Sequence, residues 1–123
     1  MSEPDPISAL PPSASLSIER RTYVRLASDR AATCSAAGRL REVGWPARVK
    51  DISRAGIGLL LQHCFRPGTT LNVELRESTS KAQRTVVARV VHATAVLVDG
   101  SPCWLVGCCF DCPLREEEFA ALR

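Results

Sequence analysis

The segment PARVKDISRAGIGLLL, residues 46–61, decides the fold of this 123-residue chain because two strand-like runs meet inside it. In the first run, residues 47–50, alanine and valine alternate with arginine and lysine, which is the two-residue period of a half-buried strand. The second run, residues 57–61, is apolar like a buried strand. We therefore expect one strand at 46–53, a tight connection, and a second strand.

Polar groups break the alternation where the first run ends. Continued at a period of two, it places Asp51 and Ser53 on the apolar face and Ile52 on the charged face. Such a break is expected at functional sites. Asp51 and Ser53 could instead hold a turn through backbone hydrogen bonds, and both readings can be true together. Gly56 predicts either a positive φ or the close approach of a ligand or backbone.

The rest of the chain reads as further short strands joined by turns. The clearest is 70–76, where leucine and valine alternate with polar residues. Other strands are expected at 31–35, at 85–98 with a bend around 93–95, and at 103–110. Short connections between antiparallel neighbours predict a closed or nearly closed barrel. The expected fold is therefore mainly β, with a six-stranded antiparallel barrel.

Both ends of the chain depart from the strand pattern. Pro113 can open a short C-terminal helix, on which Phe119 and Leu122 would face the barrel. Residues 1–17 hold four of the eight prolines and five serines. This segment has too few large apolar groups to offset the entropy lost when a chain becomes ordered. We expect a disordered N-terminal arm at 1–17 and a single domain at 18–123.

Charge and hydropathy limit the classes of function. The net charge of +3 permits an anionic ligand but is too small to argue for general nucleic-acid binding. No apolar run approaches the roughly 20 residues of a membrane span, and the N-terminus lacks the pattern of a signal peptide. We expect a cytoplasmic protein that neither binds nucleic acid nor inserts into membranes.

The six cysteines are expected to be reduced thiols that pack like small apolar groups. The spacing of Cys109 and Cys112 could form half of a zinc site, but the sequence has no second close pair. We expect no metal, although a thiol- or zinc-containing structural protein remains one interpretation.

A basic segment, ERRTYVR at residues 19–25, precedes the first expected strand. In extended backbone Arg21 and Arg25 project from the same face, about 13 Å apart. The guanidinium fork binds phosphate bidentately and pairs with guanine O6 and N7. A carboxylate or hydroxyl, as on Asp51 and Ser53, complements the donor edge of guanine. The two segments together therefore have the chemistry to hold guanine and phosphate, although the arginines alone could be a solvated turn.

The ordered pair Arg21-x-x-x-Arg25 and Asp51-x-Ser53-x-x-Gly56 resembles the two motifs of the PilZ domain family, bacterial receptors for cyclic di-GMP. The resemblance extends over roughly residues 18–123. It implies a PilZ-type barrel whose ligand lies between the arginine segment and the outside of the barrel. The implied ligand-binding residues are Arg20, Arg21, Arg25, Asp51, Ser53 and Gly56.

Each motif has its own implied role. Arg21 and Arg25 would bind guanine edges and phosphates, with Arg20 as a secondary candidate. Asp51 and Ser53 would contact the nucleotide, and Gly56 would permit the backbone path.

The expected function is a cyclic di-GMP receptor or adaptor whose arginine segment changes conformation on binding and signals to a protein effector. No enzyme activity and no cofactor are expected, because His63 and His92 have no evident nucleophile or carboxylate partner. The alternative is a PilZ-like interaction domain that binds no nucleotide.

Overall fold

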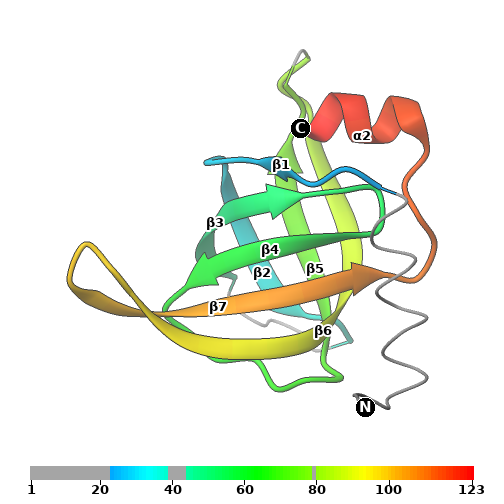
Figure 1. The fold of residues 1–123 in the computed structure, drawn as a ribbon. Coiled ribbons are helices and arrows are strands. Elements are labelled where there is room, and N and C mark those ends of the chain that lie inside the picture. The colour runs from blue at the N-terminus through cyan, green and yellow to red at the C-terminus, as the bar shows by residue number, and fades with distance from the viewer. Residues whose placement is uncertain (1–22, 39–43, 79) are drawn as a thin grey trace, which may run out of the picture.

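A computed structural model describes residues 23–38, 44–78 and 80–123 of the chain. Seven strands and one short helix follow one another along it (Figure 1). In chain order they are β1 (Leu26–Ala27), β2 (Ala31–Ala36), β3 (Trp45–Ile52), β4 (Gly56–Leu61), β5 (Thr70–Arg76), β6 (Gln83–Val98), β7 (Ser101–Phe110) and α2 (Glu116–Leu122).

The strands close into the expected barrel. Their order is β1-β3-β2-β5-β6-β7-β4, and β3 also pairs with β4, so β2 to β7 form a ring of six antiparallel strands. Strand β1 lies outside the ring, paired only with β3. Helix α2 lies over one end of the barrel (Figure 1). The predicted fold class is confirmed; β1 is an additional strand of two residues, too short to show a period.

Apolar side chains that point inward from the strands fill the interior of the barrel. Strand β5 shows the pattern most plainly, because Leu71, Val73 and Leu75 are buried while their neighbours are not. Burying one such side chain stabilises the fold by about 1.5–3 kcal/mol. Leu122 of α2 is also buried and Phe119 packs against the core, which confirms the predicted face of the helix.

The helix begins later than the sequence predicts. Pro113 does not open it: α2 starts at Glu116, and Arg115 is its N-cap. The backbone N–H of Arg115 donates to Glu118 Oε1 at 2.9 Å, so the capping box sets the first turn. The backbone N–H of Leu114 is meanwhile bonded to Arg54 O at 2.7 Å, which ties the preceding segment to the barrel instead.

The irregularity of β6 also lies earlier than the predicted bend at 93–95. Val90 pairs with Cys108 and His92 with Gly107, so Val91 is an extra residue on β6. At this point the loop after β4 holds the strand, since Gly68 N–H donates to Val90 O at 2.7 Å. The bulge therefore forms where β6 leaves β5 and continues with β7 alone.

A second bulge corrects the predicted phase of β3. Val49 pairs with Leu59 and Asp51 with Gly58, so Lys50 is an extra residue. One inserted residue exchanges the two faces of everything after it. Ile52 is consequently buried in the core, and Asp51 lies on the outer face. The expectation that Asp51 falls on the apolar face was wrong because it assumed an unbroken strand.

Candidate functional site

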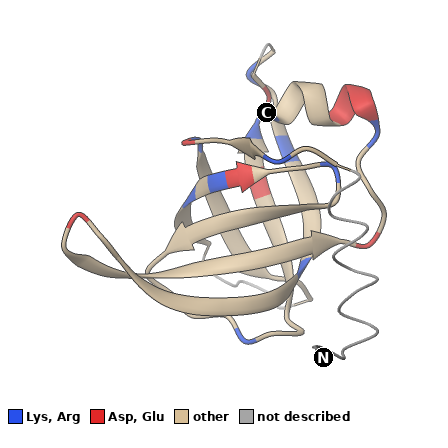
Figure 2. Ribbon diagram, in the orientation of Figure 1, with Lys and Arg blue, Asp and Glu red and all other residues tan. Residues whose placement is uncertain are grey.

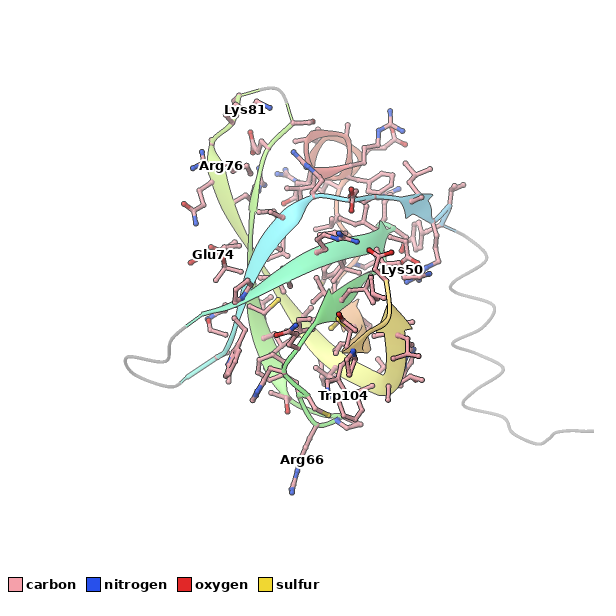
Figure 3. The ribbon with its side chains drawn as sticks, turned by 90° about the vertical axis from the view of Figure 1, so that its left-hand side faces the viewer. Lys50, Arg66, Glu74, Arg76, Lys81 and Trp104 are labelled. Carbon is pink, nitrogen blue, oxygen red and sulfur yellow. The ribbon has the colours of Figure 1, made fainter. Side chains whose placement is uncertain are left out.

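Strand β1 brings Arg25 to Asp51. Leu26 pairs with Ile52 and Ala27 with Asp51, which places the preceding Arg25 above the end of β3. Arg25 Nη2 donates to Asp51 Oδ1 at 2.9 Å, and Lys50 Nζ lies 3.8 Å from Asp51 Oδ2. Figure 2 shows charged residues adjacent at this end of β3, and Figure 3 shows Lys50 there.

This ion pair is open to solvent. The side chains of Arg25 and Asp51 are 40% and 23% exposed. An exposed pair of this kind contributes only about 0–1 kcal/mol to stability, so a ligand can replace either partner at little cost. The structure thus joins one residue from each predicted motif.

Ser53 performs the turn function that the sequence left open. Its hydroxyl oxygen accepts hydrogen bonds from the backbone N–H groups of Ala55, at 3.1 Å, and Gly56, at 3.2 Å. Its own backbone N–H donates to Gly56 O at 2.9 Å. Ser53 is buried, whereas Asp51 bonds to side chains and not to the turn. The turn interpretation is therefore confirmed for Ser53 and not for Asp51.

Gly56 is required by a close backbone approach and not by a positive φ. It does not appear among the residues with positive φ. It pairs with Cys109 on β7, and a Cβ atom at Gly56 would collide with the carbonyl oxygen of Cys108. Because that neighbour is backbone, a larger residue here would force β4 and β7 apart.

Two further glycines make room on the outside of the barrel for the side chains of Asp51 and His92. Asp51 pairs with Gly58, Gly58 with Gly107 and Gly107 with His92, so the four residues form a row across β3, β4, β7 and β6. A Cβ at Gly58 would lie 2.7 Å from Asp51 Oδ1, and one at Gly107 would collide with the ring of His92. We call this row the glycine floor. The side chains of Asp51 and His92 lie over these two glycines, where a Cβ atom would otherwise stand.

A further cation lies on the outer face of the barrel, two residues along β7 from Gly107 of the glycine floor. Arg89 of β6 pairs with Cys109 of β7, and its Nη2 lies 3.9 Å from Cys109 Sγ. Its Nη1 is 3.6 Å from Asp111 Oδ1. Arg25, Lys50 and Arg89 therefore place three positive charges near the glycine floor, of which Asp51 and Asp111 offset two.

Arg54 connects the site to the C-terminal segment. Its guanidinium lies 5.2 Å from the centre of the Tyr23 ring, and its Nε donates to Leu114 O at 2.6 Å. Through this side chain the arginine segment touches both the turn of the second motif and the segment before α2. A cation–aromatic contact of this kind contributes roughly 0.5–1 kcal/mol at an exposed site.

Several of these residues are not singled out by sequence reasoning. Arg54 lies within the second motif at a position where the motif specifies no residue type. Gly58, Gly107 and His92 become neighbours only when four strands are aligned. The available signal was glycine inside strands, which often marks close approach of a ligand or backbone. Arg20 and Arg21 of the first motif lie outside the described residues.

The cysteines behave as packing residues where they are buried. Burial raises the pKa of the Cys34 thiol to about 12. Burial, together with the nearby Cys34 and Cys109, raises the pKa of Cys108 to about 12. Both are therefore protonated and unreactive near neutral pH. Within residues 23–38, 44–78 and 80–123, no cluster of three or more His, Cys, Asp or Glu side chains could hold a metal ion.

The histidines show no catalytic arrangement in the described structure. His63 stacks on Trp45 with ring centroids 4.2 Å apart and meets Phe65 edge-on. His92 covers Gly107. Among the helices of the described part of the chain, none is long and apolar enough to cross a membrane.

Comparison with known proteins gives a family match over most of the chain. The sequence profile of the PilZ domain matches residues 19–123. No protein of curated function matches the sequence significantly.

Solved structures share the fold at low sequence identity. The Bacillus subtilis inhibitor of motility, MotI/DgrA, has a TM-score of 0.61 at 20% identity, covering 84% of this chain and 48% of that one. The PilZ domain of YcgR from Escherichia coli with c-di-GMP has a TM-score of 0.55 at 16% identity, covering 75% and 79%. The MrkH–c-di-GMP complex of K. pneumonia has a TM-score of 0.52 at 17% identity, covering 80% and 45%. This chain spans about half the length of MotI and of MrkH.

Proposed function

Because the chain belongs to the PilZ domain family, we propose that it is a receptor for cyclic di-GMP that binds the nucleotide on the outer face of the barrel around Asp51. The observation that carries the proposal is the open Arg25–Asp51 pair beside the glycine floor. Two of the similar structures hold c-di-GMP, which supports the same ligand here.

The chemistry of this pair matches the two kinds of group that the ligand presents. The Arg25 fork would bind a guanine O6/N7 edge or a phosphate, and the Asp51 carboxylate would accept from the guanine N1–H and 2-amine. In the absence of ligand each group satisfies the other at 2.9 Å. Binding therefore exchanges one charged hydrogen bond for several and leaves neither group unpaired.

The glycine floor supplies the contact surface for the rings. A purine lying over Gly58 and Gly107 would touch backbone on one side once the side chains of Asp51 and His92, which lie over these glycines, move aside. Such a contact excludes water from the Asp51 hydrogen bonds and strengthens them. Ser53 would act mainly by stabilising the turn that follows Asp51. Gly56 would act by allowing β4 to lie close to the backbone of β7.

We propose that Arg21, with Arg20 as a secondary contributor, completes the ligand grip from the same segment as Arg25. In this scheme the segment ahead of β1 becomes ordered on binding, at about 1–2 kcal/mol per residue fixed. The ordered segment would present a new surface to a protein effector, which is a shift between two populations of the same chain. Tyr23 and Arg54 already hold the end of this segment, so the change would concern the residues before Tyr23.

Hydrogen exchange tests this signalling step. Amides from about Ile18 to Tyr23 should gain protection when cyclic di-GMP is added, because the segment becomes fixed across the barrel. Amides of β5, which lies away from Asp51 in the ring, should change little. Full protection of residues 18–23 without ligand would contradict the conformational step and leave binding itself untouched.

Calorimetric titration with cyclic di-GMP, GTP and cyclic GMP tests the binding function. We expect saturable binding of the cyclic dinucleotide and at least tenfold weaker binding of the two mononucleotides. Arg25→Ala should lose about tenfold or more, since a hydrogen bond between charged groups contributes about 1.5–3 kcal/mol. Arg48→Ala is the matched control, because Arg48 also pairs with an aspartate, Asp29, at 3.1 Å on the outside of the barrel.

The alternative is a PilZ-type interaction domain that signals by protein contact without nucleotide. It predicts no heat of binding for any of the three nucleotides and no difference between Arg25→Ala and Arg48→Ala. We expect no turnover in either case, so chromatography should recover cyclic di-GMP intact after incubation with the protein. A receptor of this kind would work in the cytoplasm, where the second messenger is made.

A further inference from the structure

The hairpin formed by the ends of β6 and β7 extends beyond the barrel and has an open edge. Strand β5 pairs with β6 only between Gln83 and Arg89, and the loop after β4 reaches only Val90. Residues 92–98 pair with β7 on one side, and on the other side no described strand pairs with them. Figure 1 shows this hairpin curving away from the rest of the sheet.

The turn between β6 and β7 determines which backbone N–H and C=O groups of β6 face the open edge. Asp99 and Gly100 have φ values of 51° and 79°, so they form a two-residue turn flanked by the pair Val98 and Ser101. That flanking pair is hydrogen-bonded, so alternate residues back from Val98 point their N–H and C=O groups at β7. The N–H and C=O groups of Ala93, Ala95 and Leu97 therefore point away from β7 and need another partner.

Nothing on this edge discourages pairing with another chain. Natural edge strands are protected by charges, by proline or by a bulge within the strand. Residues 92–98 read HATAVLV, with no charged residue and no proline, and the bulge at Val91 lies before them. Leu97 is 73% exposed. In Figure 2 the hairpin carries colour only at its tip, where Asp99 lies.

We propose that this edge of β6 pairs antiparallel with the same edge of a second copy of the chain, across a twofold axis at Ala95. This register places Leu97 opposite Ala93 of the partner subunit and Thr94 opposite Val96 of the partner subunit. The Ala95 pair and the two Ala93–Leu97 pairs would form about six backbone hydrogen bonds, because all three residues present their polar groups to this edge.

Side-chain size and charge favour a second copy over an unrelated segment. On one face the exposed Leu97 would pack against the smaller Ala93 of the partner subunit. The two small Ala95 side chains would allow the strands to approach at the twofold axis. The two Asp99 carboxylates fall at opposite ends of the ladder and do not repel each other.

The extent of this contact sets its strength. A single strand-to-strand ladder of this length buries less than the roughly 1,200 Å² typical of stable interfaces, so the dimer should be weak and concentration-dependent. Closing a free edge by twofold pairing is a common symmetric solution for homodimers. The glycine floor ends at His92, before Ala93 begins the ladder, so the pairing does not require nucleotide.

Sedimentation velocity over a wide range of protein concentrations tests the proposal. The unmodified chain should shift from monomer to dimer as concentration rises. Leu97→Lys should weaken association at least tenfold, because it places a charge opposite Ala93 of the partner subunit at both Ala93–Leu97 pairs of the ladder. Val87→Lys is the matched control: Val87 is 49% exposed on the same strand, at a position that β5 covers.

A thermal melt shows that both variants remain folded, as expected for exposed positions. A chain that stays monomeric at its highest soluble concentration would overturn the proposal. So would a Leu97→Lys variant that associates like the unmodified chain, or a Val87→Lys variant that dissociates equally.

Discussion

Two arginine–carboxylate contacts on this barrel are built differently. At the end of β3, Arg25 bonds one oxygen of Asp51, and the other oxygen lies 3.8 Å from Lys50, beside the glycine floor. Near α2, Arg84 lies between two glutamates, with Nη1 2.8 Å from Glu77 Oε2 and Nη2 2.9 Å from Glu118 Oε2. The first contact joins two side chains through one hydrogen bond, and the second holds Arg84 through two.

The glutamates of the second cluster are held by further donors. The Ser80 hydroxyl, followed by Arg84, lowers the pKa of Glu77 below its ordinary value. The backbone N–H of Arg115 is the main cause that lowers the pKa of Glu118, with Arg84 contributing less. The cluster joins the loop after β5, strand β6 and helix α2. The Arg84 cluster ties three elements of the fold together, whereas the single Arg25–Asp51 pair is the one that we propose for recognition.

The largest effect is expected from filling the glycine floor. Gly58→Val would place a branched side chain where its Cβ lies 2.7 Å from Asp51 Oδ1, displacing the carboxylate and covering the surface for the purine. We expect cyclic di-GMP binding to weaken about 100-fold, equivalent to about 2.8 kcal/mol, without loss of the fold.

Calorimetry measures the affinity, and Asn72→Val on β5 is the control, since it adds valine to a half-buried position away from Asp51. Unchanged affinity in Gly58→Val would place the ligand elsewhere on the barrel.

Ser53→Ala should affect stability more than it affects binding. It removes the acceptor for two buried backbone N–H groups, those of Ala55 and Gly56. The free energy of unfolding should fall by about 1–3 kcal/mol, measured by urea denaturation. Binding should weaken only through the loosened turn. A variant with normal stability and lost binding would instead make Ser53 a direct ligand contact.

Asp51→Ala should show the opposite balance. The exposed pair with Arg25 adds little stability, so the melting temperature should change by no more than a degree or two. Affinity for cyclic di-GMP should fall about tenfold. A lowered melting temperature with near-normal affinity would assign Asp51 to the fold and remove the contrast with the Arg84 cluster.

The smallest expected effect is a pH dependence confined to the second cluster. Glu77 and Glu118 have lowered pKa values in the folded state, so their stabilising contribution is present above the ordinary glutamate value of 4.5. It is lost as the pH falls through the lower folded values. Both carboxylates are partly exposed, so the change should be modest and weaker in high salt.

Thermal melts between neutral and acidic pH measure this effect. Arg84→Met should lower the melting temperature by a few degrees at neutral pH and flatten its acidic decline, with nucleotide affinity unchanged. An equally steep decline in Arg84→Met would show that other carboxylates cause the acid sensitivity.

The sequence predicts the fold well where strands keep their period. The bounds of β5 agree with the prediction because its alternation is unbroken from Thr70 to Arg76. Prediction fails at the two bulges, since an inserted residue such as Lys50 leaves no mark in composition and reverses the two faces after it. The start of α2 is set by the bonds of Arg115 and Leu114, which depend on the folded barrel.

The site is predicted only in part for a related reason. The motif order identifies Arg25 and Asp51, and the structure brings them together. The glycine floor exists only in the register of four strands, of which β6 is separated from β3 by two others along the chain. A linear motif records residues close in sequence and omits Gly107 and His92, which the barrel brings to the same place.

The two-residue turn at Asp99 and Gly100 has a consequence for the order of folding. Strands β6 and β7 need no distant segment to pair, and a hairpin of this kind forms in about 1–10 μs. Closing the ring between β4 and β7 requires Gly56 to meet Cys109, a non-local and slower step. We expect the hairpin to form early and the ring to close around it. Gly100→Ala, which strains a φ of 79°, should then slow refolding while leaving the unfolding rate nearly unchanged.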